Sequence, residues 1–107
     1  MPTNEGERYR FYRKLLKGYV LGGLGRRGEA LETLSSFQRD VVELGYTTDE
    51  LKYLKCYAAA VGNDILKSSG DQRPLFPIDY DGFDLSKVPR YVRRHFPLRY
   101  HPRWEKV

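Results

Sequence analysis

The chain has 107 residues, which is enough for one small domain and too few for two independent hydrophobic cores. It is 40% hydrophobic and 31% charged and contains no apolar run long enough to cross a bilayer, so we expect a globular protein without a transmembrane segment. The single cysteine, Cys56, excludes an internal disulfide and a cysteine-based zinc site, and the net charge of +5 favours an acidic partner.

A first helix is predicted over residues 5–21. Asn4 and Glu7 have the spacing of a capping box, and apolar side chains then recur at helical intervals, in Tyr12, Leu15, Leu16, Tyr19 and Val20. Glycines follow at positions 22, 23 and 25. Because glycine adopts left-handed conformations without steric cost, we expect the helix to stop directly before them.

Two further helices are predicted, one from Gly28 to Gly45 and one that starts with a Thr47–Glu50 capping box and stops at Ser68, Ser69 and Gly70. In both, apolar residues alternate steps of three and four, as in a helix that packs along its neighbours. Three such helices with short connections can bury their stripes only against one another. The sequence therefore predicts an all-α fold, an antiparallel three-helix bundle over residues 1–70, with a shared core of Tyr12, Leu15, Leu34, Phe37, Leu54, Ala58 and Val61.

Residues 71–107 differ in composition and are predicted to form an extended tail. Prolines at positions 74, 77, 89, 97 and 102 prevent a long helix, although Ser86 could cap a short one. The tail is rich in aromatic residues, unlike a disordered linker. We expect it to anchor the chain to a large protein assembly through aromatic and arginine side chains, namely Tyr91, Arg93, Arg94, Phe96, Arg99, Tyr100 and Trp104.

The candidate binding site of the bundle is a basic ridge on the first helix. On a helical wheel the ridge residues share one stripe, nearly opposite Tyr12 and Leu15; they are Arg10, Arg13, Lys14 and Lys17. Residues 8–27 contain no acidic side chain, whereas a helix that is charged only for solubility usually mixes both signs. The ridge therefore predicts docking of an acidic partner.

The run Phe-Tyr-Arg-Lys-Leu-Leu-Lys at positions 11–17 resembles the signature of the mitochondrial LYR-motif proteins. The family's second mark, a phenylalanine late in the second helix, is matched by Phe37. The resemblance implies a three-helix, non-catalytic accessory subunit or assembly factor of a respiratory complex. It also implies a location on the matrix side of the mitochondrion, peripheral to the inner membrane.

The same resemblance implies an acyl carrier protein as partner. Carboxylates of the carrier would pair with the basic ridge and with Arg39, around Tyr12 and Phe37. The chain needs no cofactor of its own in this interpretation, but the carrier's acyl-phosphopantetheine chain would lie between the helices. Small residues could leave room for it or could merely let the helices approach closely; they are Ala30, Ala58, Ala59, Ala60 and Gly62.

The alternative function is that of a mitochondrial ribosomal or other RNA-binding protein. Basic residues interleaved with aromatic residues over positions 90–103 suit contacts with RNA phosphates and stacking on nucleobases. An enzyme is not predicted, because His95 and His101 lack companions for a metal site and no serine or cysteine lies in a nucleophile motif.

Overall fold

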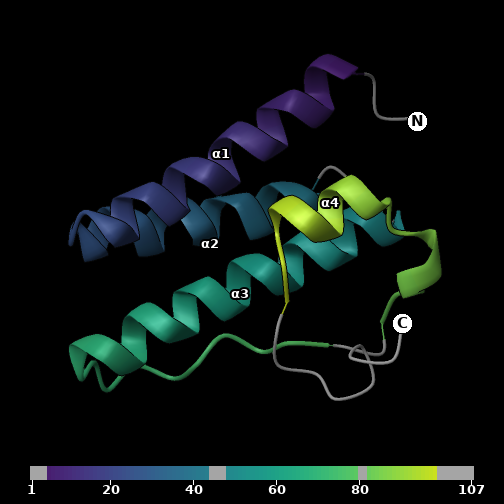
Figure 1. Cartoon of the computed structure of the whole chain (residues 1–107). Helices are drawn as coiled ribbons and strands as arrows, with labels where there is room; N and C mark the ends of the chain where they lie inside the picture. Colours follow the sequence, from purple (N-terminus) through teal and green to yellow (C-terminus); the bar gives the residue numbers. More distant parts are fainter. Residues whose placement is uncertain (1–4, 44–47, 80–81, 99–107) are drawn as a thin grey trace.

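The computed structural model of the chain describes residues 5–43, 48–79 and 82–98. Within these ranges the fold is helical and contains no strand. The elements are α1 (Glu5–Gly23), α2 (Arg27–Glu43), α3 (Asp49–Ser69), the single 3₁₀ turn η1 (Leu85–Lys87) and the short α4 (Arg90–His95) (Figure 1). The predicted all-α class with three main helices packed against each other is confirmed.

The helix α1 continues two residues beyond its predicted end. The left-handed turn is made by Gly25, with a φ of 80°, and the Arg26 amide closes it by donating to the Leu21 carbonyl over 3.0 Å. Gly22 stays within the helix, where a Cβ would lie only 2.9 Å from the Ile65 side chain of α3. This glycine therefore permits a close helix contact and does not stop the helix.

The limits of α3 are set by caps that its own sequence supplies. Thr48 is the N-cap, and its side chain accepts a hydrogen bond from the Leu51 amide, whereas Thr47 of the predicted box lies outside the described residues. At the other end Gly70 takes a left-handed conformation with a φ of 69°, and the Asp71 amide donates to the Leu66 carbonyl. The predicted stop after Ser69 is thus confirmed.

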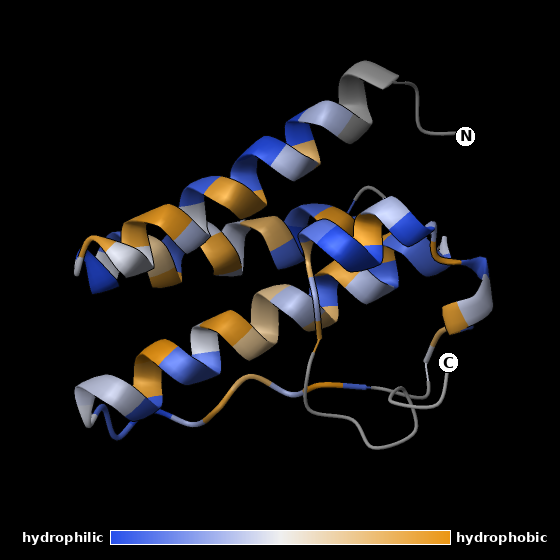
Figure 2. Ribbon diagram, in the orientation of Figure 1, coloured by the Kyte–Doolittle hydropathy of each residue, from blue (hydrophilic) through white to orange (hydrophobic). Residues whose placement is uncertain are grey.

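The core lies between the three long helices, with α2 packed against both α1 and α3. Its largest fully buried side chains on these helices are Phe37, Leu15, Leu34 and Leu54. Ala58 is buried as predicted, and Tyr12 and Val61 pack at the edge of the core, where they are partly buried. Figure 2 shows the hydrophobic segments recurring along each helix at the spacing that this packing requires.

In the described ranges 71–79 and 82–98 the tail packs against the bundle, whereas the sequence predicted a separate arm. After Gly70 the chain runs back along α3 (Figure 1) and is fixed there by Asn63, whose amide nitrogen donates to the Phe76 carbonyl and whose oxygen accepts from the Phe76 amide, over 3.1 and 2.7 Å. Gly62 makes room for the Phe76 ring. The tail residues Val88, Val92 and Phe96 are buried in the same core as the three helices.

The helix α4 completes this core because α1 and α3 have few contacts with each other. It lies between them in Figure 1, and its Phe96 ring is stacked on Tyr12 of α1 and edge-on to Tyr57 of α3. The predicted Ser86 cap of this helix is not formed, because the N-cap of α4 is Pro89, without a side-chain hydrogen bond. Asp84 caps η1 instead, and its carboxylate accepts bonds from the Ser86 amide and hydroxyl. Pro89 then forces Val88 into extended backbone, which separates η1 from α4.

Candidate functional site

The basic ridge of α1 is exposed over most of its length. Arg10, Arg13 and Lys17 are exposed, whereas Lys14 is partly buried and forms an ion pair of 2.6 Å with Asp40 of α2. This arrangement follows from the apolar stripe on another side of the helix, which turns Phe11 and Leu15 into the core. Figure 2 shows the resulting hydrophilic segments along α1.

A groove between α1 and α2 brings the ridge together with the second helix. It is lined by Lys14, Lys17, Leu21, Arg26, Glu29, Glu32, Thr33, Ser36 and Arg39. The predicted residues Lys14, Lys17 and Arg39 therefore share one site, although they come from two helices. Sequence reasoning missed Arg26, Thr33 and Ser36. Arg26 directly precedes α2, and the other two lie at helical spacing from Arg39. All three become neighbours of the ridge only once α1 and α2 pair.

The cations of this site differ in their availability to a partner. Lys14 is paired with Asp40, and Arg26 forms an exposed ion pair of 2.6 Å with Glu29. Within the described ranges, Arg10, Lys17 and Arg39 have no such carboxylate partner. The unpaired positive charge is thus concentrated on the ridge and on the neighbouring edge of α2, where an acidic surface would meet it directly.

Tyr12 and Phe37 belong to the interior and its edge. The Tyr12 hydroxyl donates to the Glu50 carboxylate of α3, and its ring stacks on Phe96 at a centroid distance of 5.8 Å. Phe37 has no exposed surface and packs edge-on against Phe11. The predicted core position of Phe37 is therefore confirmed, and the ring has no exposed surface to offer a partner while it holds α1 and α2 together.

The predicted anchors of the tail are divided by the structure. Tyr91 and Arg94 are exposed, and Arg93 is partly buried, with an Nε atom that is buried and has no hydrogen-bond partner among the described residues. Phe96 is wrong as an anchor for another protein, because it is buried between α1 and α3 of its own chain. Arg99, Tyr100 and Trp104 lie outside the described residues.

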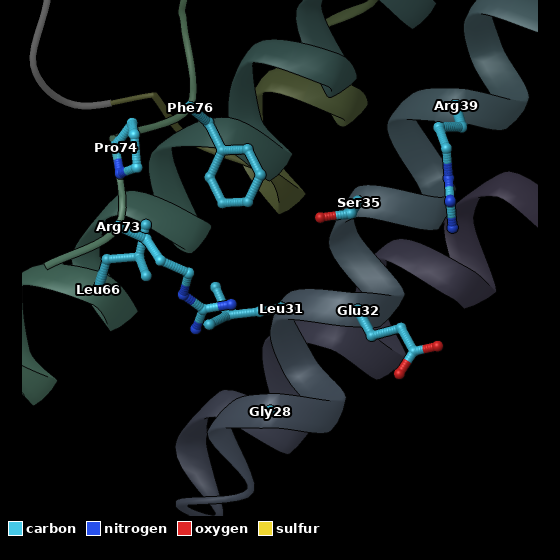
Figure 3. A pocket seen from close by; sticks show the side chains of 9 residues that line it. All are labelled: Gly28, Leu31, Glu32, Ser35, Arg39, Leu66, Arg73, Pro74 and Phe76. Carbon is cyan, nitrogen blue, oxygen red and sulfur yellow. The ribbon is translucent and has the colours of Figure 1, made fainter. Parts of the chain in front are cut away.

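A second pocket lies on the other side of α2, between α2, α3 and the tail (Figure 3). Its apolar wall is formed by Leu31, Leu66 and Phe76, and the close-up shows the Ser35 hydroxyl pointing toward the Phe76 ring. Arg73 also lines it, but this guanidinium is bound to Asp71 over 2.7 and 2.9 Å and lowers the pKa of that carboxyl. Glu32 and Arg39 line both pockets and mark the boundary between them on α2.

Cys56, the one thiol of the chain, is buried. Burial raises the pKa of the Cys56 thiol to about 11, so the thiol is protonated at neutral pH and is a poor nucleophile. The thiol donates a hydrogen bond to the Asp79 carbonyl, with 3.4 Å between Sγ and the oxygen. No group of three or more His, Cys, Asp or Glu side chains in the described part of the chain is placed to hold a metal ion.

Comparison of the chain with protein-family models, with curated proteins and with solved structures gives no match. Among the helices described here, none combines the length and apolar character that a bilayer crossing needs. The candidate site therefore rests on its own geometry: a basic helix face and a groove in which cations of α1 and α2 converge.

Proposed function

We propose that the chain is a non-catalytic docking subunit that binds an acidic helical protein along α1 and the α1–α2 groove. The observation that supports this proposal is the convergence of Lys17 and Arg39, without carboxylate partners among the described residues, beside an α1 ridge that lacks acids. Exposed ion pairs contribute only about 0.2–1 kcal/mol each. Charge would therefore set the orientation and rate of docking more than its affinity.

The partner that we propose is an acyl carrier protein, in keeping with the resemblance of residues 11–17 to the LYR-motif proteins. In this proposal the chain is an accessory subunit or assembly factor of a mitochondrial respiratory complex, on the matrix side and peripheral to the inner membrane. RNA binding through the tail is the weaker candidate, because Phe96, one of the aromatic rings offered for base stacking, is buried.

The carrier's acyl-phosphopantetheine chain is the second part of the proposal. The small residues of α3 do not leave the space that such a chain needs: the Phe76 ring lies where a Cβ on Gly62 would be, and Ala58 and Ala59 are closely packed. The α1 and α3 helices are bridged by α4 through Phe96. We therefore expect an acyl chain to enter only when α4 moves away from the bundle. Such a movement would be measured as faster hydrogen exchange of the Val92 and Phe96 amides when acylated carrier is added.

The docking proposal is tested by reversing two charges of the groove, Lys17→Glu and Arg39→Glu, and measuring binding to an acyl carrier protein at low salt. Both side chains are exposed, so the fold should persist while the association rate falls about tenfold. The matched control, Lys67→Glu with Lys87→Glu, changes the net charge equally at exposed positions of α3 and η1. Equal rates for the two double variants would contradict the proposal.

A further inference from the structure

The outer face of α1 carries an exposed apolar stripe beside the basic ridge. Among the described residues, eight large hydrophobic side chains are exposed, and five lie on α1 or in the turn after it: Tyr9, Leu16, Tyr19, Val20 and Leu24. Tyr9, Leu16 and Val20 are spaced by seven and four residues, so they form one line along the helix. Their exposed fractions are 63%, 47% and 53%, and scattered surface leucines do not explain such an alignment.

The surroundings of this stripe are basic. On one side it is bordered by Arg13 and Lys17, and the Arg13 guanidinium lies 5.7 Å from the centre of the Tyr9 ring. On the other side lies α4, which reaches α1 through the stacking of Phe96 on Tyr12 and exposes Arg90 and Arg94. The apolar line thus has cations along one border and the helix α4 beyond the other, in a helix without an acidic side chain from position 8 onward.

The charge pattern selects among the surfaces that could cover the stripe. A second copy of the chain is disfavoured, because pairing two such faces would bring like charges together. A bilayer with anionic headgroups suits the pattern, since it surrounds an inserted apolar line with negative charge on both sides. Leucine, valine and tyrosine flanked by lysine and arginine are also the side chains that enter the headgroup region of membranes.

The geometry points to an anionic lipid surface as the occupant of the α1 stripe, with α1 lying parallel to the membrane plane. Leu16 and Val20 would enter the boundary between headgroups and acyl chains, while Arg13 would extend to the phosphates and Lys17 would stay with the groove. Lys14 lies about a quarter of a turn or more from the stripe around the α1 axis, toward α2. Arg39 lies on α2 itself, across the groove from Lys14. One chain can therefore bind lipid and an acidic protein at the same time, and the inference does not depend on the carrier.

The test is flotation of the full chain with two kinds of vesicle, one of phosphatidylcholine alone and one that also contains phosphatidylglycerol. The wild-type chain is expected to float with the anionic vesicles and not with the neutral ones. The variant Leu16→Ser with Val20→Ser is expected to reduce this partitioning about tenfold or more, because it removes the apolar line and keeps every charge. The matched control, Val42→Ser with Leu75→Ser, alters two exposed apolar residues elsewhere and should float as wild type.

Several results would overturn the inference. Absence of flotation with anionic vesicles would leave the stripe to a protein partner, and equal flotation of wild type and the Leu16→Ser, Val20→Ser variant would mean that charge alone attracts the chain. Carrier binding separates this inference from the proposed function: the stripe variant should keep wild-type carrier binding, and the Lys17→Glu, Arg39→Glu variant should lose it. If the stripe variant also lost the carrier, the stripe would belong to the carrier interface and the lipid assignment would be wrong.

Discussion

Gly62 shows how one missing side chain positions the tail on α3. A Cβ at this position would lie 2.7 Å from the Phe76 ring, which cannot easily move away because Asn63 holds the Phe76 backbone at both its amide and its carbonyl. Gly62→Ala should therefore lower the free energy of unfolding by about 1–3 kcal/mol, although alanine favours the helix by roughly 1 kcal/mol.

The matched control for this prediction is Gly28→Ala in the first turn of α2, where a Cβ would meet nothing within 4 Å. This variant should be neutral or slightly stabilising in urea or thermal unfolding. If the two variants unfolded alike, the Phe76 ring would not be fixed over Gly62, and the attachment of the tail at this point would be wrong.

Cys56 links stability to alkaline pH. Because burial raises the thiol pKa to about 11 from its ordinary value of 9.0, the folded state holds its proton at pH values where the unfolded chain has lost it. The thiol thus stabilises the fold below about pH 9, and this contribution, roughly 2 kcal/mol, is lost as the pH rises toward 11. Urea unfolding of wild type and Cys56→Ala across this range should show a steeper decline for wild type.

Tyr53 adds a second loss of stability at high pH, because burial also raises the pKa of its phenol. In the Cys56→Ala variant, which lacks the thiol, the fall in the free energy of unfolding above about pH 10 measures the contribution of the Tyr53 phenol. A Cys56→Ala profile parallel to that of wild type between about pH 9 and 11 would show that the thiol is not buried as described.

At the scale of elements, α4 decides whether the three long helices form a complete core. Removal of all residues after Gly70 takes away Val88, Val92 and Phe96, each worth roughly 1.5–3 kcal/mol when fully buried. Since small domains are stable by only about 5–15 kcal/mol, we expect the truncated chain to melt at a much lower temperature or to be molten. Circular dichroism with a dye that binds exposed apolar surface measures this.

A smaller change keeps the chain length constant. Phe96→Ala should cost about 3–5 kcal/mol, because the ring is buried between Tyr12 and Tyr57. A truncated chain or a Phe96→Ala variant with the melting temperature of wild type would restore the sequence-based view of an independent bundle with a separate tail.

The three long helices could be predicted because their signals are local. Apolar spacing, the acidic and hydroxyl caps and the glycine stop at Gly70 act within a few residues, so they are readable from the sequence. The role of Gly22 was not readable, because its reason is Ile65 on another helix. The docking of α4 was also beyond prediction, since it depends on a gap between α1 and α3 that exists only in the assembled fold.

At the scale of the whole molecule, the positive charges of the candidate site could be predicted, but the side chains that pair with them or approach them within the chain could not. A helical wheel suffices to predict that Arg10, Arg13 and Lys17 are exposed. The Lys14–Asp40 pair and the approach of Arg39 to the ridge cannot be predicted in this way, because they require α1 and α2 to be paired. Phe96 was misassigned for a related reason: large aromatic side chains dominate both cores and interfaces, and sequence alone does not distinguish the two.

The hydroxyl of Tyr53 closes the fold over a long stretch of chain. It donates to the Phe96 carbonyl over 2.6 Å and accepts from the Leu98 amide over 3.3 Å, positions 43 and 45 residues further along. Contacts between such distant residues generally form after neighbouring helices have paired. We therefore expect Tyr53→Phe, at a cost of about 1–2 kcal/mol, to speed unfolding about tenfold in stopped-flow experiments while refolding stays nearly unchanged.

A refolding rate that fell by the same factor would mean that α4 docks in the transition state itself. With the expected result, the two properties separate: pairing of the three long helices determines how quickly the native state is reached, and the latch between Tyr53 and the end of α4 determines how long each molecule remains in it. The lifetime of the folded chain would then depend on a few residues that contribute little to the speed of its formation.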